Sequence, residues 1–416
     1  MKIAVPRETF AGELRVALLP PNVATLVKLG HEVAIESGAG VAAGVGDDEY
    51  RGAGAAVGPD RRELIGGADV VLQVRGLGTN PEAGRADLDL FRSGQILIGQ
   101  QDPLWLPELI REQAELGLTV LALETIPRIS RAQSMDVLSS MATIAGYKAV
   151  LLAAMRLPKM FPMLMTAAGT LAASKVFVLG AGVAGLQAIA TARRLGALVD
   201  GYDIRPAAAE QIRSLGAKVV ELPLETADAE GAGGYAKEQG EDFQRRQREL
   251  LASVLQERDV VITTAAIPGA KSPLLITREM VEGMKPGSVI VDLAAERGGN
   301  CEITEADREV AHGGVLVLGP TDLPASVPRH ASQMFANNLT TLLKHLTEDG
   351  RIELDMADEI TRDTTVARGG EVLHPRVRQK LGLPDLTPPA EPPPAGEPTP
   401  SGAPPAAGGP DPATTR

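Results

Sequence analysis

The sequence contains a single cysteine, and this scarcity excludes a group of sites. Cys301 alone can form neither an intrachain disulfide nor a cluster of thiolate metal ligands. The five histidines are scattered without the short spacing of metal ligands: His31, His312, His330, His345 and His374. We therefore expect no metal site, and we interpret Cys301 and His312 as structural residues.

Positive charge and long apolar runs are also scarce. The chain has 41 Lys and Arg against 53 Asp and Glu, a formal net charge of −12. This balance excludes a general nucleic-acid binder, which needs a basic face, but allows a nucleotide cofactor held locally by backbone amides. No stretch approaches the roughly 20 apolar residues of a membrane-spanning helix, and the first residues lack a signal-peptide pattern. We expect a cytoplasmic protein that does not insert into a membrane and reaches one only through partners.

Aromatic residues make up only 3% of the chain, whereas hydrophobic residues make up 44%. The cores should therefore consist mainly of Val, Leu, Ile and Ala. A length of 416 residues exceeds what one core usually supports, so we expect two lobes. From residue 384 the sequence is rich in Pro, Ala and Gly without apolar periodicity, which predicts a disordered tail at 384–416.

Short apolar strands alternate with amphipathic helices in the first third of the chain. Strands are predicted at 2–5, 32–36, 68–74, 95–98 and 119–124, and helices at 21–29 and 106–116. This alternation is typical of an α/β lobe with a mainly parallel sheet. A long helix is predicted at 130–157, where Ser130 and Gln133 have the spacing of a capping box.

A second α/β unit begins at Lys175. Strands are predicted at 175–179, 198–202, 218–222, 260–264, 288–293 and 315–318, with helices at 183–195 and 207–215. The stretch 223–257 is expected to be irregular and then helical, and a further helix is expected at about 334–346.

The motif Gly180-Ala-Gly182-Val-Ala-Gly185 lies between a predicted strand and a predicted helix, as a dinucleotide-binding turn requires. Gly180 permits the tight turn, Gly182 lets the backbone approach the pyrophosphate, and Gly185 lets the helix pack on the strand. Asp203 ends the next strand, where a carboxylate accepts ribose hydroxyls and repels a 2′-phosphate, so NAD(H) is favoured. Arg205 weakens this preference, since an arginine there can accommodate a 2′-phosphate.

Four further segments carry a resemblance to a known family. They are Pro127-Arg-Ile-Ser-Arg-Ala-Gln-Ser-Met-Asp-Val-Leu-Ser-Ser140 with Ala145-Gly-Tyr147, Phe161-Pro-Met-Leu-Met-Thr-Ala-Ala-Gly-Thr170, Gly233-Gly-Tyr-Ala-Lys-Glu238, and Lys285-Pro-Gly-Ser-Val-Ile-Val-Asp-Leu-Ala294 with Gly298-Gly-Asn300. These segments resemble the NAD(H)-binding alpha subunits of proton-translocating transhydrogenases, over roughly residues 1–380.

The resemblance implies two Rossmann-like α/β lobes with parallel sheets flanked by helices and an NAD(H) cleft between them. The first lobe would be 1–137, completed by about 326–383, and the second 138–325. It also implies direct hydride transfer from NADH to NADP⁺ on a partner subunit. Membrane-spanning subunits would translocate protons, and the chain would be a homodimer attached peripherally to the inner membrane through these partners.

The resemblance also implies the site residues. The cofactor-binding set is Arg128, Ile129, Ser130, Arg131, Gln133, Asp136, Ser139, Gly180, Gly182, Val183, Gly185, Asp203, Ile204, Arg205, Gly234, Tyr235, Thr264 and Ala265. Those nearest the reaction would be Arg128, Gln133, Asp136, Ser139 and Tyr235. Arg128 and Gln133 offer donors for a carboxamide or ribose, Tyr235 would close over the nucleotide on a glycine hinge, and Thr264 and Ala265 would line the adenosine.

Each assignment has a plainer alternative. Ser130 and Gln133 could simply cap a helix, and Asp136 with Ser139 could belong to a solvated stripe. Tyr235 could be an ordinary loop aromatic. We interpret Arg131 as a surface or packing residue in preference to a ligand.

Alanine dehydrogenase belongs to the same fold family, and its opening resembles Arg15-Val-Ala-Leu here. That enzyme has a catalytic His where this chain has Gly99-Gln-Gln-Asp-Pro103, and a pyruvate-binding Lys near Arg75. Near its catalytic Asp, this chain offers only Glu296. Amino-acid oxidation needs a general acid–base group, whereas exchange between two nicotinamides needs none, so the missing His favours a transhydrogenase. A non-catalytic NAD-binding regulator is the remaining alternative.

Overall fold

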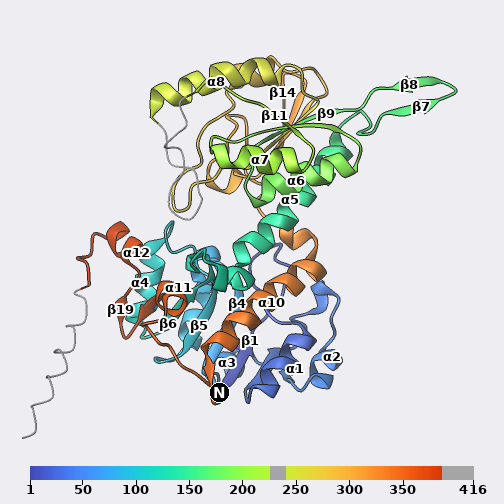
Figure 1. The fold of residues 1–416 in the computed structure, drawn as a ribbon. Helices are drawn as coiled ribbons and strands as arrows, with labels where there is room; N and C mark the ends of the chain where they lie inside the picture. The colour runs from blue at the N-terminus through green and yellow to red at the C-terminus, as the bar shows by residue number, and fades with distance from the viewer. Residues whose placement is uncertain (225–239, 387–416) are drawn as a thin grey trace, which may run out of the picture.

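The computed structural model describes residues 1–224 and 240–386. Within these ranges two sheets form the centres of two lobes, which confirms the predicted two-lobe α/β fold (Figure 1). The predicted site residues Gly234 and Tyr235, the hinge residue Gly233, and the tail from residue 387 lie outside the described residues.

The sheet of the first lobe has eight strands in the order β19-β18-β6-β5-β4-β1-β2-β3. The strands are β1 (Lys2–Val5), β2 (Glu32–Glu36), β3 (Ala56–Gly58), β4 (Val70–Arg75), β5 (Ile96–Gln100), β6 (Thr119–Ala122), β18 (Thr365–Arg368) and β19 (Glu371–Val372). Strands β6 to β3 are parallel, and only β18 and β19 pair antiparallel at the edge. The chain therefore returns to this lobe after it has formed the other.

The helices of the first lobe lie mostly where apolar periodicity predicts them. They are α1 (Pro20–Lys28), α2 (Asp47–Gly52), α3 (Arg61–Gly66), α4 (Pro107–Glu115), α10 (Pro328–Leu346), α11 (Glu359–Thr364) and α12 (Pro375–Lys380), with 3₁₀ turns η1 (Val41–Ala43), η2 (Leu77–Thr79), η3 (Ala83–Leu90), η4 (Leu123–Thr125) and η5 (Ser130–Met135). A small hairpin, β16 (Thr347–Glu348) and β17 (Arg351–Ile352), follows α10.

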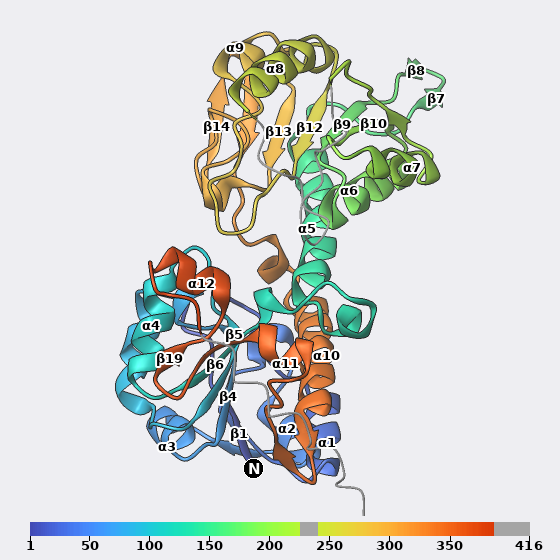
Figure 2. The same ribbon diagram turned by 60° about the vertical axis from the view of Figure 1, so that its left-hand side comes forward.

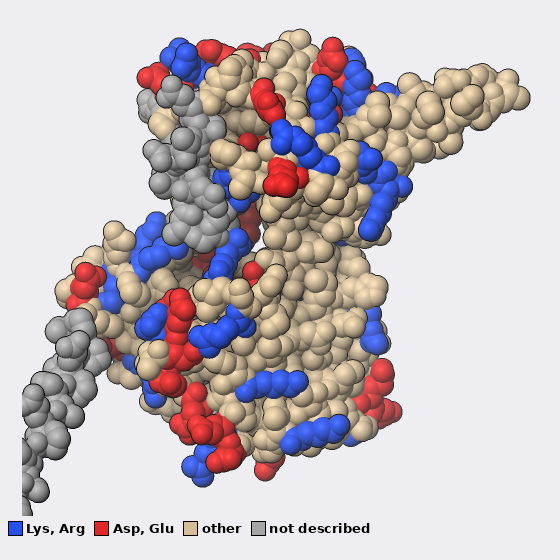
Figure 3. All heavy atoms as spheres, viewed as in Figure 1, with Lys and Arg blue, Asp and Glu red and all other residues tan. Residues whose placement is uncertain are grey.

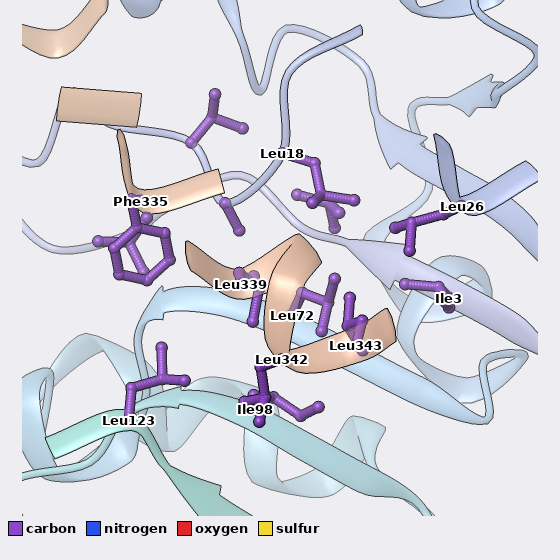
Figure 4. Packing of buried hydrophobic residues seen from close by; sticks show 14 of the residues in the cluster. Ile3, Leu18, Leu26, Leu72, Ile98, Leu123, Phe335, Leu339, Leu342 and Leu343 are labelled. Atoms are coloured by element: carbon purple, nitrogen blue, oxygen red, sulfur yellow. The ribbon is translucent and has the colours of Figure 1, made fainter. Parts of the chain in front are cut away.

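Helix α10 packs into the core of the first lobe and begins six residues before the predicted helix, with Pro328 in its first turn. Figure 4 shows Phe335, Leu339 and Leu342 of α10 among apolar side chains of the sheet, such as Leu72 and Ile98. The predicted return of the chain to the first lobe is confirmed.

The sheet of the second lobe has seven strands in the order β11-β10-β9-β12-β13-β15-β14. They are β9 (Lys175–Leu179), β10 (Leu198–Tyr202), β11 (Lys218–Val219), β12 (Val260–Thr263), β13 (Val289–Asp292), β14 (Glu309–His312) and β15 (Val315–Leu318), and only β14 is antiparallel. The helices are α6 (Val183–Arg194), α7 (Pro206–Ser214), α8 (Glu241–Leu255) and α9 (Arg278–Glu282), with turns η7 (Ala295–Arg297) and η8 (Leu323–Ser326). Strand β11 is shorter than the prediction of 218–222.

Helix α5 (Val137–Arg156) runs from one lobe into the other (Figure 2). Its first half buries Met141 and Ile144 in the core of the first lobe. Its second half buries Val150 and Ala153 in the core of the second. Of the described helices, α5 alone is long and apolar enough to cross a membrane by length and composition. The prediction that no stretch approaches this length is therefore wrong, because a helix that serves two cores is apolar along its whole length.

Candidate functional site

The order of the strands reverses beside β9, which has β10 on one side and β12 on the other. Open α/β sheets bind ligands at the carboxyl ends of the strands at such a switch point. The Thr264 hydroxyl, after β12, donates to the Gly180 carbonyl, after β9, at 3.1 Å. The Thr264 amide donates to the Leu179 carbonyl at 2.9 Å. Two predicted site residues thus meet where the fold places a ligand.

The three glycines of the dinucleotide motif have distinct surroundings. Gly180 has a φ of 98°, which favours glycine. A Cβ on Gly185 would lie 1.8 Å from the Gly180 carbonyl oxygen, so the helix packs directly on the turn. Around Gly182, at the start of α6, no atom lies within 4 Å of an ideal Cβ. The helix N-terminus, with Val183 as its first residue, is open to a phosphate group.

The carboxylate of Asp203 closes this turn from β10. Its Oδ2 accepts the Ala181 amide at 2.7 Å, and its Oδ1 accepts the Arg205 amide at 2.8 Å. The Arg205 guanidinium also binds both oxygens, at 2.9 and 2.8 Å. Ile204, between them, packs partly buried against the core. Asp203 therefore ties the turn to the strand and carries the adjacent arginine.

Ala265 is held by residues that the site prediction missed. The Ala265 amide donates to Asn300 Oδ1 at 3.0 Å, and Asn300 Nδ2 donates back to the Ala265 carbonyl at 2.8 Å. The carboxylate of Asp292, wholly buried, accepts the Asn300 amide at 2.7 Å and the Thr263 hydroxyl at 2.8 Å. A signal was present in the sequence, because Asp292 is the one charged residue ending the apolar strand β13.

The segment 128–135 is a 3₁₀ turn that displays its polar side chains. Ala132 and Met135 are buried at a spacing of three, which matches the three residues per turn of a 3₁₀ helix. Arg128, Ser130 and Gln133 are exposed, and Ile129 is partly buried. The apolar residues anchor the turn, and the residues predicted to bind nucleotide face outward.

The predicted capping box at Ser130 and Gln133 is wrong. These residues lie in η5, and neither caps a helix through its side chain. Helix α5 starts after Asp136, whose carboxylate accepts the Ser139 amide at 2.9 Å and the Ser139 hydroxyl at 2.6 Å. A spacing of three fits a 3₁₀ turn as well as a capping box, and an aspartate is the stronger N-cap. The solvated-stripe alternative for Asp136 is also wrong, since it is the N-cap.

Arg131 points to another element. Its Nη2 donates to Asp358 Oδ1, at the start of α11, at 2.9 Å. This contact agrees with its interpretation as a surface residue. The hydrogen bond from the His345 ring to Asp358 adds a third residue to this small cluster.

Helices α5 and α6 bring the two halves of the candidate site together. A Cβ on Gly146 would lie 2.1 Å from the Ala184 carbonyl oxygen, so the two backbones cross in close contact. From Asp136 to Gly146 the helix rises about 15 Å, comparable to the reach of an extended dinucleotide from its pyrophosphate to its nicotinamide ring. The surface is hollowed between the lobes (Figure 3).

The residues at the alanine dehydrogenase positions are already engaged. Arg75 binds Glu13 at 2.9 Å and Asp322 at 2.5 Å, and its guanidinium stacks over Phe10. Burial opposes ionisation of Glu13, but the hydrogen bond and charge of Arg15 lower its pKa to about 2. The arginines are thus neutralised internally and are not presented to a substrate carboxylate.

A second contact between the lobes lies at the carboxyl ends of β5 and β13. Arg297 forms an ion pair with Asp102, and its guanidinium lies 4.7 Å from the ring of Trp105. Asp102 has a φ of 46°, rare for a residue with a side chain, and burial raises its pKa to about 6. The sequence analysis did not identify this contact, because neither residue carries a local motif.

Known proteins resemble this chain over nearly its full described length. Family models described as alanine dehydrogenase/PNT N-terminal and C-terminal domains match residues 4–145 and 149–375. The first of the separate polypeptides named NAD(P) transhydrogenase subunit alpha in Rhodospirillum rubrum is 46% identical over 378 residues, covering 90% of this chain and 98% of that protein. Alanine dehydrogenase of Bacillus subtilis is 30% identical, covering 92% and 95%.

Solved structures give the same order. The transhydrogenase of Sinorhizobium meliloti matches with a TM-score of 0.80 and 44% identity, covering 89% of this chain and all of that one. An L-alanine dehydrogenase matches with a TM-score of 0.74 and 27% identity, covering 92% and 99%. The chain belongs to the alanine dehydrogenase/PNT family, and within it to the alpha subunits of NAD(P) transhydrogenases.

Proposed function

We propose that this chain holds NAD(H) between its lobes and exchanges hydride directly with NADP(H) on a partner subunit. The observation that carries the proposal is the open start of α6 at Gly182, directly after the switch-point strand β9. The pyrophosphate would bind there, in contact with Gly180, Val183 and Gly185. The adenosine would lie toward Asp203, Ile204, Arg205, Thr264 and Ala265.

The nicotinamide and its ribose would reach the turn at the start of α5. The residues proposed to bind them are Arg128, Ile129, Ser130, Gln133, Asp136 and Ser139, with Gly234 and Tyr235 proposed from the family resemblance alone. Arg131 is the weakest member of the set, because it is paired with Asp358. We also propose residues 138–325 as the nucleotide-binding lobe, and 1–137 with 326–383 as the other.

Catalysis in this proposal is positional. The bound nicotinamide supplies the hydride chemistry, and the residues of this chain orient the ring and limit its motion. Two nicotinamides held with reacting carbons about 3–3.5 Å apart need no acid or base from the protein. The internal pairing of Arg75 and the absence of His in 99–103 suit such a reaction better than amino-acid oxidation.

The partners follow from the same proposal. The chain carries one dinucleotide fingerprint, so a separate subunit would hold NADP(H), and membrane-spanning subunits would couple the exchange to proton translocation. We infer that the chain works at the cytoplasmic face of the inner membrane, attached through these subunits.

We also propose a homodimer formed through the hairpin of β7 (Leu164–Thr166) and β8 (Gly169–Leu171). This hairpin projects from the second lobe (Figure 1), and residues 160–174 contain no charged side chain. Met163, Met165 and Leu171 are 59%, 78% and 50% exposed. Apolar surface of this kind marks an interface, and an isolated hairpin has little stability alone. A Met165→Lys variant that stays dimeric in sedimentation analysis would contradict this assignment.

A reconstituted assay tests the central proposal. The chain is mixed with an NADP(H)-binding transhydrogenase domain, and reduction of an NAD analogue by NADPH is followed. We expect transfer that requires both proteins and falls at least tenfold in Gln133→Ala. Ser134→Ala is the matched control, because its side chain is also exposed on the same turn. Tight NADH binding without transfer would overturn the proposal and direct attention to amino-acid substrates, then to a regulatory role.

A further inference from the structure

Asn338 is an amide on the apolar side of α10. It lies three residues after Phe335 and four before Leu342, so the three share one stripe of the helix. Only 8% of Asn338 is exposed. A buried amide is unfavourable unless it is hydrogen-bonded, so the partner of Asn338 indicates what the residue does.

That partner is the turn that carries Gln133. Asn338 Nδ2 donates to the backbone carbonyl of Ser134 at 2.8 Å. The turn has weak internal support at this end, where the Asp136 amide lies 3.4 Å from the Gln133 carbonyl. Long 3₁₀ runs have poor hydrogen-bond geometry, so an external donor at the Ser134 carbonyl restrains the end of the turn.

Two other contacts hold the same turn against the returning C-terminal segment. Ala132 and Met135 are buried in the core cluster that includes Phe335 and Leu339 of α10. Arg131 is tied to Asp358 at the start of α11. The buried face of the turn is thus fixed by α10 and α11, whereas Gln133 projects from the exposed face.

We propose that Asn338 is a positioning residue for hydride transfer: through the Ser134 carbonyl it fixes the turn from which Gln133 contacts the nicotinamide end of bound NAD(H). The inference rests on the proposed function. It assigns to α10, in the first lobe, a role in orienting a ligand whose phosphates bind at α6 in the second. Asn338 itself touches neither the ligand nor the reacting atoms.

The expected effect is on turnover more than on affinity. The adenosine and pyrophosphate contacts remain intact when Asn338 is replaced, so the KM for NADH should change less than about twofold. Losing one neutral hydrogen bond to the turn should lower kcat about three- to tenfold. Water can replace the amide at the carbonyl of the exposed Ser134, so the fold should persist.

The experiment compares Asn338→Ala with Asn337→Ala, singly and each combined with Gln133→Ala. Asn337 is the neighbouring residue on α10, but it is exposed and its side chain accepts from Asn22 at 3.0 Å, away from the turn. Transfer rates with the NADP(H)-binding domain, NADH affinity by calorimetry and the midpoint of urea denaturation are measured for each variant. If Asn338→Ala fails to fold, Asn338→Ser replaces it, being polar but too short to reach the carbonyl.

Support requires that Asn338→Ala lowers kcat with little change in NADH affinity, that Asn337→Ala does not, and that the Asn338 effect disappears in the Gln133→Ala background. Equal effects in both backgrounds would overturn the inference, because Asn338 would then act independently of Gln133. Wild-type rates in Asn338→Ala would also overturn it. Failure of the proposed function is distinguishable, because the wild-type chain itself would then give no transfer.

Discussion

At the scale of single residues, Asp203 combines two tasks that the sequence suggests separately. Its carboxylate holds the Ala181 amide of the phosphate-binding turn and also pairs with Arg205. While this pair is intact, the arginine is neutralised and a carboxylate faces the ribose. A 2′-phosphate would therefore meet negative charge before positive charge.

Asp203→Asn should reverse this balance. We expect NADH affinity to fall about tenfold, which corresponds to about 1.4 kcal/mol, and NADPH affinity to rise as Arg205 becomes available. Calorimetric titration with both nucleotides measures the ratio. Asp200→Asn is the control, since Asp200 lies on the same strand but pairs with Arg258 at 2.8 Å. A similar change of the ratio in both variants would contradict this role for Asp203.

Glu124 makes the stability of the protein depend on pH. Burial raises the pKa of Glu124 from 4.5 to about 7, and its Oε2 is buried without a hydrogen-bond partner in the described structure. The folded state therefore binds a proton more tightly than the unfolded state does. The resulting stabilisation is fully present below pH 4.5 and is lost as the pH rises through 7.

The urea midpoint of the wild type should therefore fall between about pH 5 and 8, and that of Glu124→Gln should fall less. The substitution keeps the shape of the side chain and removes the ionisation. Glu112→Gln, at a more exposed ion pair with Arg85, should leave the wild-type slope unchanged. Parallel curves for wild type and Glu124→Gln would show that this carboxyl does not titrate in that range.

At the scale of elements, the parallel strands were predictable and the start of α5 was not. Strands β1, β2, β9, β10 and β15 have the predicted bounds, because each is a continuous apolar run between turn residues. The start of α5 was mispredicted because Ser130 and Asp136 both offer caps, and only burial of Met135 decides between them.

Two antiparallel elements were missed for a related reason. Strand β14 has half-exposed residues and little apolar character, and the β7–β8 hairpin is exposed on almost every residue. Neither shows the apolar pattern by which a buried strand is recognised. In the candidate site, the fingerprint and Asp203 were predictable from local spacing. Asn300, Asp292 and the Arg297–Asp102 pair depend on contacts between distant segments, and no local pattern reports them.

Gly146 and Gly182 should separate the packing of the two helices from nucleotide binding. In Gly146→Ala the new Cβ meets the Ala184 backbone of α6, so we expect a loss of about 1–3 kcal/mol in the free energy of unfolding. In Gly182→Ala the space is open and the backbone permits alanine, so stability should be unchanged and NADH affinity should fall. Urea denaturation and calorimetry on both variants test this, and equal stability losses would contradict it.

At the scale of the whole molecule, the lobes are joined on one side and clasped on another. Helix α5 and the segment 319–327 connect them covalently, and helix packing at Gly146 stiffens that side. The contact of Arg297 with Asp102 and Trp105 forms a second, noncovalent link between the lobes. Removing it should leave the connection intact and loosen the angle between the lobes.

Arg297→Ala tests this link, and Trp105 is its reporter because it is the only tryptophan of the chain. Loss of the stacked guanidinium should expose the indole, shift its emission to longer wavelength and raise the radius of gyration in X-ray scattering. In the wild type the same emission change should appear as the pH falls through about 6, because burial raises the pKa of Asp102 to that value and protonation removes the ion pair. Arg308→Ala removes an exposed pair with Glu305 within the second lobe and should change neither quantity. If Arg297→Ala shifts the emission but leaves the radius unchanged, the contact orders only Trp105, and the angle between the lobes is set by α5 and the segment 319–327.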